Sequence, residues 1–543
     1  MVFARRSTTL LAAIIASCAM VLSLTACTSD NKTVVDGQTT VTSNSAGGVA
    51  VFTPSDGITL NQQTPLNKWA KLVHDLTKAL VDAGFKKGDI DHTTSDSLDK
   101  QSRAIQDFVV DHLSNNTTDD SGIAIAPDNM TLLVAPVVEA DASTRQYGDY
   151  VSQNLSTNDA TDGEATSDGE SSEDDSSKDD SSNTESDSTA SDEQAQAVDR
   201  LVSSLKLAKE SGMHVVLLGN SIEGYKPDAF VKFSDAQTIG KLQAEKMVSK
   251  LKLDKASKDN PKYIEVLLPY TAVDEKGNAN DSTFAQEAFR GIWQVLGSYY
   301  QKGVVESPSG TLDGKSTEND WQAVAYDAAK EGSTAKVLDK RLAKTDGQST
   351  LTRIDGIITM NDYIASEVVK ELDDLGYTGS AADINPQITI SGIVGNITGK
   401  KDLSRDAVPD PIKSPENDNA NDSSSSDDDA DEDTSASDKD RDSQWPLVTG
   451  YGAYVSNIPS IVNGKQWMTG MEDRQTIATD IAQACAKLNK DEALNSMPSI
   501  RNSEVGGVKK IPTISEPLLA VSASNLKSAL IDPGYISLAD AGL

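Results

Sequence analysis

The feature that most constrains the fold is a regular alternation of short apolar runs with longer amphipathic stretches. MTLLVAPV (130–137) and HVVLLGN (214–220) are apolar runs, whereas SLDKQSRAIQDFVVDHL (97–113) and AVDRLVSSLKLAKESG (197–212) have helical periodicity. Apolar runs of this length between amphipathic helices indicate parallel βαβ units in an open, doubly wound sheet. The second half of the chain repeats the series, for example in YIEVLLPY (263–270). The sequence therefore predicts an α/β fold with two similar lobes.

The length of the chain supports this prediction. A chain of 543 residues exceeds the size at which one hydrophobic core usually keeps growing. Its apolar content of 37% is sufficient for globular cores. Two or more lobes are therefore expected.

Two acidic segments interrupt the alternation. Residues 157–193 contain fourteen Asp or Glu and one Lys, and residues 415–443 contain twelve acidic residues and two basic ones. Segments rich in Ser, Asp and Asn, without apolar periodicity, cannot bury enough surface to offset the entropy of ordering. We expect two disordered acidic insertions that act as solvated spacers. Neither has the ligand spacing of a calcium loop, so no metal site is predicted.

The overall charge excludes one class of partner. The formal net charge is −34, and no basic cluster offers a phosphate-binding surface. Nucleic acid is therefore not an expected partner.

The N-terminus has the features of an export signal. Arg5 and Arg6 precede an apolar run, residues 10–24, that is too short to span a bilayer permanently. The run ends in LTAC, which resembles the bacterial lipobox and implies lipidation of Cys27. The alternative is an ordinary signal peptide with an incidental cysteine. Lipidation would hold the protein on the extracytoplasmic face of the cell membrane without a transmembrane helix.

The pair Asn361 and Asp362 follows the apolar run of IDGIITMND (354–362). In open α/β sheets, ligands bind outside the carboxyl ends of the strands, and this pair is expected there. Alternatively, Asp362 caps the following helix and Asn361 is a turn residue. Capping and ligand binding can coexist.

Four stretches, in the same order along the chain, resemble the sugar-binding proteins of ABC importers. They are QSRAIQDFV (101–109), VKFSDAQTIGKLQAEKM (231–247), GIITMNDYIASEVVKELDDLGY (356–377) and VKKIPTISEPLLAVSASNLKSALIDPGYIS (508–537). The likeness is to the type I periplasmic binding protein family, particularly its xylose and multiple-sugar branch. It implies two lobes joined by three crossing segments, near 232–235, 473 and 512–516.

This resemblance sets the expected domain organisation. It comprises a signal peptide (1–26), a disordered tether (27–46), an N-terminal lobe (47–234 plus 474–512, with an insert at about 151–195) and a C-terminal lobe (235–473 plus 513–543, with an insert at about 400–443).

The resemblance also implies ligand-binding residues. Asn361 and Asp362 match a strand-end ND pair that binds sugar hydroxyls. Trp69 and Trp321 fall where the family places aromatic rings against a pyranose, although either could be a packing residue. Asp235 lies at the first crossing, where it is a ligand, a hinge residue or a helix cap.

The sequence departs from the family at two strand ends that bear on the solute site. Asn220 and Ser221 stand where the family has an Asp-Arg pair. A second strand-end Asp is replaced by Gly452 or, in an alternative alignment, by Val394. Loss of charged hydrogen bonds, each worth about 1.5 to 3 kcal/mol, would weaken a sugar site.

Catalysis has little support in the sequence. The four histidines, at 74, 92, 112 and 214, lack metal-ligand spacing, and no nucleophile elbow, P-loop or dinucleotide motif appears. No enzyme activity and no cofactor are expected. The expected function is capture of a small polar solute, such as a sugar, by a lipid-anchored monomer that delivers it to an ABC permease. The alternative is a sensory or scaffolding lipoprotein of the same fold with lost or altered sugar binding.

Overall fold

The computed structural model describes residues 46–56, 65–115, 125–138, 144–157, 185–273, 280–328, 330–343, 351–382 and 445–543. The expected signal peptide, Cys27, nearly all of the tether and the second acidic insert lie outside these ranges. Most of the first insert does too, but its expected bounds, 151–195, were too wide. Strand β4 (Asn154–Leu155) lies inside them, and helix α4 begins at Glu185.

The N-terminal lobe is built on a seven-stranded sheet in the order β15-β16-β7-β5-β3-β1-β2. Strands β15 and β16 form an antiparallel hairpin, and all other pairs are parallel. The strands are β1 (Gly48–Pro54), β2 (Ile90–Ser95), β3 (Met130–Val134), β5 (His214–Leu218), β7 (Ala229–Lys232), β15 (Ile500–Val505) and β16 (Val508–Ser515).

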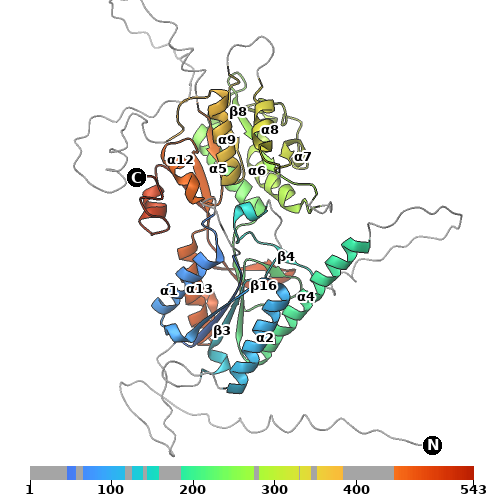
Figure 1. The fold of residues 1–543 in the computed structure, drawn as a ribbon, viewed down its shortest axis with the longest axis vertical. Helices are drawn as coiled ribbons and strands as arrows, with labels where there is room; N and C mark the ends of the chain where they lie inside the picture. The colour runs from blue at the N-terminus through green and yellow to red at the C-terminus, as the bar shows by residue number, and fades with distance from the viewer. Residues whose placement is uncertain are drawn as a thin grey trace, which may run out of the picture. The chain divides into compact units, whose positions relative to one another are not determined.

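Helices cover both faces of this sheet (Figure 1). They are α1 (Trp69–Asp82), α2 (Leu98–Asn115), α4 (Glu185–Glu210) and α13 (Arg474–Leu488). Helix α1 packs beside α13, and α2 packs beside α4. Strand β1 shows the alternation, because Val49 and Val51 join the core under α1 and α13, whereas Ala50 and Phe52 join the core under α2 and α4. The N-terminal lobe therefore has three layers.

The C-terminal lobe has a smaller parallel sheet in the order β10-β8-β12-β13. Its strands are β8 (Lys262–Val266), β10 (Val305–Glu306), β12 (Gly356–Ile358) and β13 (Leu447–Thr449). Its helices are α5 (Ala236–Leu251), α6 (Thr283–Gln301), α7 (Trp321–Val324), α8 (Ser333–Arg341), α9 (Asp362–Leu375) and α12 (Ile458–Val462). Ile357 and Ile358 of β12 point into separate cores, one containing residues of α8 and α9 and the other residues of α5 and α6.

Two glycines allow α5 and α6 to pack closely. A Cβ added at Gly240 would lie 2.2 Å from the Ala288 carbonyl oxygen, and one at Gly291 would lie 2.0 Å from that of Gln237. Any side chain at either position would force the helices apart.

The chain crosses between the two lobes at three places. These are 233–235, between β7 and α5, 472–473, between β14 (Met468–Met471) and α13, and 516–518, between β16 and β17 (Leu519–Ser522). Strands β14 and β17 pair antiparallel, and a five-residue π-helix (Lys527–Ile531) follows β17. The fold is therefore two α/β lobes joined by three segments.

Several elements differ from the sequence-based expectation. Helix α7 ends at Val324 and is followed by strand β11 (Ala325–Tyr326), which pairs with β9 (Leu268–Pro269). Edge strand β2 was not predicted, because most of its residues are exposed and polar. Val394, the alternative to Gly452 in the sequence alignment, lies outside the described residues, and β13 at 447–449 is the strand paired with β12.

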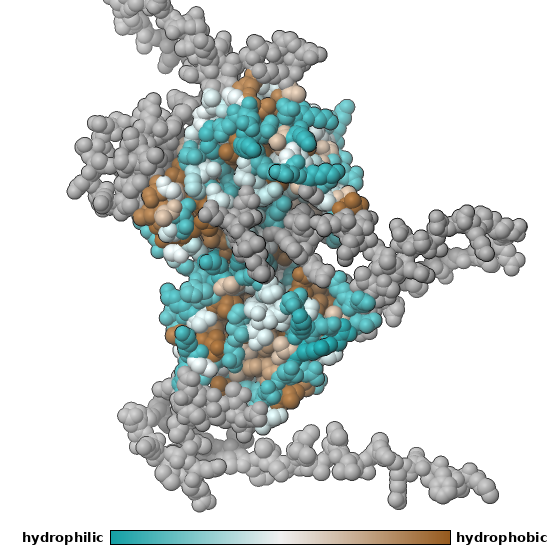
Figure 2. Space-filling model, viewed as in Figure 1, coloured by the Kyte–Doolittle hydropathy of each residue, from teal (hydrophilic) through white to brown (hydrophobic). Residues whose placement is uncertain are grey.

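Hydrophilic residues cover much of the visible surface of both lobes (Figure 2). Among the described residues, large exposed apolar side chains are Val81, Val110, Leu113, Val273 and Leu538. No helix in the described ranges is long and apolar enough to cross a membrane.

Candidate ligand site between the two lobes

Residues at the carboxyl ends of the strands of both lobes meet between the lobes. We define the interlobe interface as residues 66–69 and 144–151 of the N-terminal lobe with 361 and 451–454 of the C-terminal lobe. A backbone hydrogen bond joins the lobes directly, from Leu66 N to Gly452 O at 2.9 Å. This is the position at which open α/β sheets bind ligands.

Asn361 is the N-cap of α9 and also contacts the other lobe. Its Oδ1 accepts a hydrogen bond from Ile364 N at 2.9 Å, and its Nδ2 donates to Gln146 Oε1 at 3.0 Å. The alternative in the sequence analysis gave the capping role to Asp362, which was wrong by one residue. Asn361 is fully buried, so its amide is available to a solute only if Gln146 moves.

Asp362 is a buried structural carboxylate. It accepts hydrogen bonds from Gln466 Nε2 at 2.7 Å, Thr469 Oγ1 at 2.9 Å and Tyr454 N at 2.9 Å. Burial raises its pKa to about 6 despite these hydrogen bonds. Its contacts hold the loop after β13 and strand β14 together within the C-terminal lobe, and both of its oxygens are occupied.

The two tryptophans lie in different cores. Trp69 is 3% exposed, and its ring packs edge-on against Tyr150 at 5.1 Å and Phe233 at 5.8 Å between ring centroids. Trp321 is half-buried against the C-terminal lobe and packs edge-on against Tyr270 at 5.1 Å. The structure therefore does not place the two rings on opposite sides of a common space.

The remaining predicted residues have internal partners. Asn220 accepts a hydrogen bond from Gln153 N at 3.0 Å and donates to Pro136 O at 2.9 Å. Asp235 caps α5 by accepting from Thr238 N at 2.7 Å, which matches the capping alternative. Burial acts to raise the pKa of Asp235, but the hydrogen bonds from Thr238 and the nearby Lys232 leave it below its usual value.

The segment 144–151, between β3 and β4, connects the predicted residues of both lobes. From it, Gln146 contacts Asn361 through its side chain and accepts a hydrogen bond from Tyr454 Oη at its carbonyl oxygen, at 2.7 Å. The ring of Tyr147 enters the core of the C-terminal lobe, 4.6 Å from the Phe284 ring. In Figure 1 this part of the chain lies between the two sheets.

The same segment also fills the space beside Trp69. The Tyr150 ring stacks on Phe233 at 4.9 Å, and its hydroxyl donates to Lys68 O. Asp149 forms an ion pair with Lys68 Nζ at 2.8 Å and accepts from Trp69 N at 3.1 Å. Sequence analysis missed this segment because its residues follow no apolar periodicity and adjoin the first acidic insert.

Comparisons with known proteins find likeness only at the level of structure. No protein-family model and no curated protein matches the sequence. Similar solved structures include an ABC transporter solute-binding protein from Clostridium phytofermentans with bound β-D-glucose, 17% identical, with a TM-score of 0.44 over 91% of this chain and 99% of that one.

Two further structures belong to the same group. A carbohydrate transporter solute-binding protein from Chloroflexus aurantiacus, in complex with D-glucose, is 18% identical, with a TM-score of 0.42 over 92% of this chain and 98% of that one. The arabinose-binding protein AraP of Geobacillus stearothermophilus is 10% identical, with a TM-score of 0.42 over 89% and 99%.

A buried carboxylate links two of the three crossing segments. Glu472 Oε1 accepts a hydrogen bond from Ser234 N at 2.7 Å and contacts Ser234 Oγ. Tyr451 Oη lies 2.6 Å from Ser234 Oγ and 3.4 Å from Glu472 Oε1. Burial raises the pKa of Glu472 to about 7, although the Ser234 and Tyr451 hydrogen bonds oppose the shift.

This raised pKa predicts that stability falls as pH rises. The folded state binds the Glu472 proton more tightly than the unfolded state, so its contribution is full below the ordinary pKa of 4.5 and is lost as pH approaches about 7. Asp149 and Asp362, whose pKa values burial raises to about 6, act in the same direction. Between pH 4.5 and about pH 7, Glu472 lowers the free energy of unfolding by about 3 kcal/mol.

Urea unfolding at about pH 5 and about pH 7.5 measures this effect. Glu472→Gln, which keeps an oxygen acceptor but cannot ionise, should flatten the dependence without abolishing it. A wild-type protein that becomes more stable over this range would contradict the assignment, as would a variant with the wild-type slope.

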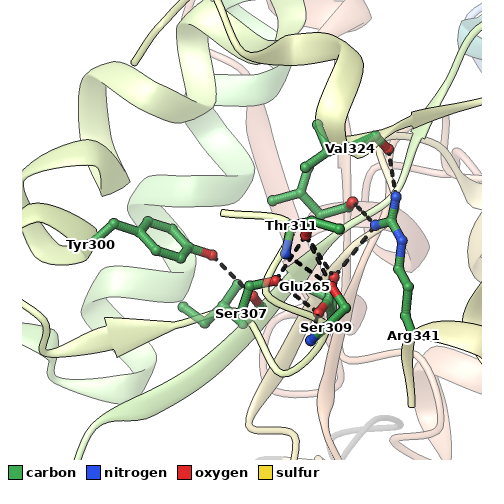
Figure 3. Close-up of polar contacts among 9 residues, drawn as sticks. Glu265, Tyr300, Ser307, Ser309, Thr311, Val324 and Arg341 are labelled. Carbon is green, nitrogen blue, oxygen red and sulfur yellow. Dashed lines mark hydrogen bonds and ion pairs between the residues drawn. The ribbon is translucent and has the colours of Figure 1, made fainter. Parts of the chain in front are cut away.

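A second buried charge network lies in the C-terminal lobe (Figure 3). Glu265 of β8 is fully buried and accepts from Ser307 Oγ at 2.7 Å and from Ser309 N at 2.8 Å. Arg341 of α8 lies 3.4 Å from Glu265 Oε2 and donates to Val324 O at 2.9 Å. The network thus ties α8 to β8 and to the end of α7, the helix that begins with Trp321.

A pocket of about 740 Å³ lies away from the interlobe interface. It includes His214 and Asp228 near the amino ends of β5 and β7, and Ile500 at the start of β15. The pocket lies at the amino ends of β5 and β7, which is the end of the N-terminal sheet opposite to residues 66–69. No group of metal-ligating side chains occurs among the described residues.

Proposed function

We propose that this protein is an extracytoplasmic solute-binding protein that holds a small polar solute between its two lobes and delivers it to an ABC permease. The observation that carries the proposal is the set of interlobe contacts at Gln146. Groups of the C-terminal lobe, the Asn361 amide and the Tyr454 hydroxyl, close on a polar side chain and a carbonyl of the N-terminal lobe. An amide and a hydroxyl in a buried interface are suited to the hydroxyl groups of a sugar.

The similar solved structures support a sugar as the solute class, because those proteins bind glucose and arabinose. Three connecting segments permit the hinge movement by which two-lobed receptors open and close around a ligand. In this proposal the closed arrangement of the lobes opens, segment 144–151 withdraws from Asn361 and Trp69, and the solute replaces it. Trp69 and Asn361 are the residues proposed to contact the solute.

The proposal includes a lipid anchor at Cys27 and attachment to the outer face of the cell membrane, on the grounds of the LTAC sequence after an apolar run. Persistence of fatty-acid labelling in Cys27→Ser would refute the anchor. A monomeric state and the permease partner are part of the same proposal.

A second candidate function is a sensory or scaffolding lipoprotein with lost or altered sugar binding. The observation that favours it is the packing of Trp69, whose ring already contacts the rings of Tyr150 and Phe233 edge-on. The hydrogen bonds of the Asn220 amide with backbone groups also favour this second function.

A thermal-shift screen separates the two candidates. The panel is D-glucose, D-xylose, L-arabinose, D-ribose and myo-inositol. A sugar at about one hundred times its Kd should stabilise the protein by about 2.7 kcal/mol. Asn361→Ala should then bind that sugar about tenfold or more weakly, because the solute loses a hydrogen-bond partner in a buried site. A wild-type protein that no sugar in the panel stabilises would favour the second function.

A further inference from the structure

Segment 144–151 is connected to the N-terminal lobe. It precedes strand β4, which pairs in parallel with β6 (Ser221–Ile222), and β6 follows β5 of the N-terminal sheet. Just beyond the segment, Gln153 O accepts a hydrogen bond from Ser221 N at 3.0 Å. These contacts attach the segment to the N-terminal lobe.

Two side chains of the segment nevertheless enter the core of the C-terminal lobe. Tyr147 is 1% exposed and Val151 is 7% exposed, and both belong to the apolar cluster that contains residues of α5, α6 and β8. The centroid of the Tyr147 ring lies 4.6 Å from that of Phe284 and 6.3 Å from that of Tyr451. Withdrawing a buried aromatic ring into water is unfavourable, because its apolar surface is exposed again. Tyr147 is therefore an apolar anchor of the N-terminal lobe in the core of the C-terminal lobe.

Polar contacts on the two sides of Tyr147 go to opposite lobes. Before it, the side chain of Gln146 accepts from Asn361 and its carbonyl oxygen accepts from Tyr454, both in the C-terminal lobe. After it, Asp149 pairs with Lys68 of the N-terminal lobe at 2.8 Å. Within four consecutive residues, the segment thus bonds to both lobes.

Gly148 separates the two sets of contacts. Its φ is +95°, and a Cβ there would lie 2.7 Å from the Cβ and the carbonyl oxygen of Asn67. Only glycine permits this conformation and this close approach without strain. An alanine at 148 would therefore displace the segment from the N-terminal lobe.

We propose that segment 144–151 is an internal latch that holds the two lobes closed without a solute. In two-lobed receptors, closure is driven by contacts that a ligand makes with both lobes. Here side chains of the chain itself make such contacts, with Tyr147 as the apolar anchor and Gln146 as the polar one. The latch therefore shifts the equilibrium between open and closed lobes toward the closed form before any solute binds.

The latch also lowers the affinity for a solute that binds between the lobes, a point that rests on the proposed function. Such a solute competes with the latch, so only the unlatched fraction of the protein binds it, and the apparent affinity is reduced by that fraction. Removing the anchor should therefore strengthen binding, whereas loss of a residue that contacts the solute would weaken it.

The test measures the distance between the lobes in the absence of sugar, by double electron–electron resonance. Spin labels are attached at Gln106→Cys of α2 and Lys336→Cys of α8, which are exposed positions in different lobes. In the chain from residue 28 onward, Cys485 is the only other cysteine and is buried. Tyr147→Ala should lengthen the mean distance by more than about 2 Å and broaden its distribution, because the lobes then open about the three crossing segments.

Tyr300→Ala is the matched control. Tyr300 is also 1% exposed and belongs to the same apolar cluster, but it lies on α6 of the C-terminal lobe itself. Both variants should lower the melting temperature, and only Tyr147→Ala should lengthen the distance. If Tyr147→Ala does not fold, Gly148→Ala is measured for the same change in distance.

A second measurement uses the sugar identified in the panel. Calorimetry should show that Tyr147→Ala binds this sugar at least about tenfold more tightly than the wild type does. An unchanged interlobe distance in Tyr147→Ala, or an equal lengthening in Tyr300→Ala, overturns the latch. Weaker sugar binding by Tyr147→Ala also overturns it and leaves the proposed function standing. If no sugar in the panel binds either protein, the proposed function fails, and the distance measurement alone decides on the latch.

Discussion

Replacement of Arg341 by methionine should lower the free energy of unfolding by about 3 to 5 kcal/mol, the largest effect expected of any single substitution considered for this chain. Arg341 and Glu265 have side-chain exposures of 8% and 0%. Removing the guanidinium leaves the Glu265 charge buried with only hydroxyl and amide donors around it (Figure 3). The carbonyl oxygens of Val266 and Val324 also lose their donor.

The contribution of the Arg341–Glu265 ion pair to stability can be separated from that of the packing of the Arg341 side chain. The double variant Arg341→Met with Glu265→Gln removes both charges, so it should recover part of the stability lost by Arg341→Met alone. Urea unfolding of the wild type, both single variants and the double variant measures the coupling. A loss below about 1 kcal/mol for Arg341→Met would mean that the pair behaves as an exposed one.

Asp362→Ala should be the second large effect, a loss of about 3 kcal/mol. Removal of the carboxylate takes an acceptor from Tyr454 N, Gln466 Nε2 and Thr469 Oγ1 in a fully buried region, although the last two keep a second acceptor, Met468 O at 3.1 Å and Gly470 O at 3.4 Å. A buried donor left without an acceptor costs about 1 to 3 kcal/mol. Relief from burying the charge offsets part of this cost near neutral pH, because burial raises the pKa of Asp362 to about 6.

The neighbouring residue supplies the comparison for Asp362. Asn361→Ala removes the helix cap and should cost only about 0.5 to 2 kcal/mol. Asp362→Asn, which keeps one acceptor oxygen, should fall between the wild type and Asp362→Ala. Equal losses for Asp362→Ala and Asn361→Ala would indicate that the buried carboxylate network contributes little beyond a cap.

Sequence analysis located the strand-end pair but not the roles within it. The apolar run before Asn361 and the helical periodicity after it are local signals, and both elements form as expected. The partners of Asp362 lie about one hundred residues away, at Tyr454, Gln466 and Thr469. Periodicity carries no information on such contacts, so only ligand binding and helix capping were considered for the carboxylate.

Periodicity also could not predict which residues surround the two tryptophans. Trp69 begins helix α1, but its neighbours Tyr150 and Phe233 come from segments that follow other strands of the sheet. Segment 144–151 has no hydrophobic periodicity that would predict its position, because its rings enter two different cores. Tyr147 lies in the core of one lobe and Tyr150 in the core of the other.

Hydrogen exchange of the mature protein with and without the sugar found in the panel tests most directly whether the solute binds between the lobes. The account predicts slower exchange in both lobes at once, at 65–69 and 451–454, together with faster exchange in 144–151 as the solute replaces this segment. Protection confined to the pocket at His214, Asp228 and Ile500, or no change at the interlobe interface with a bound sugar, would contradict it.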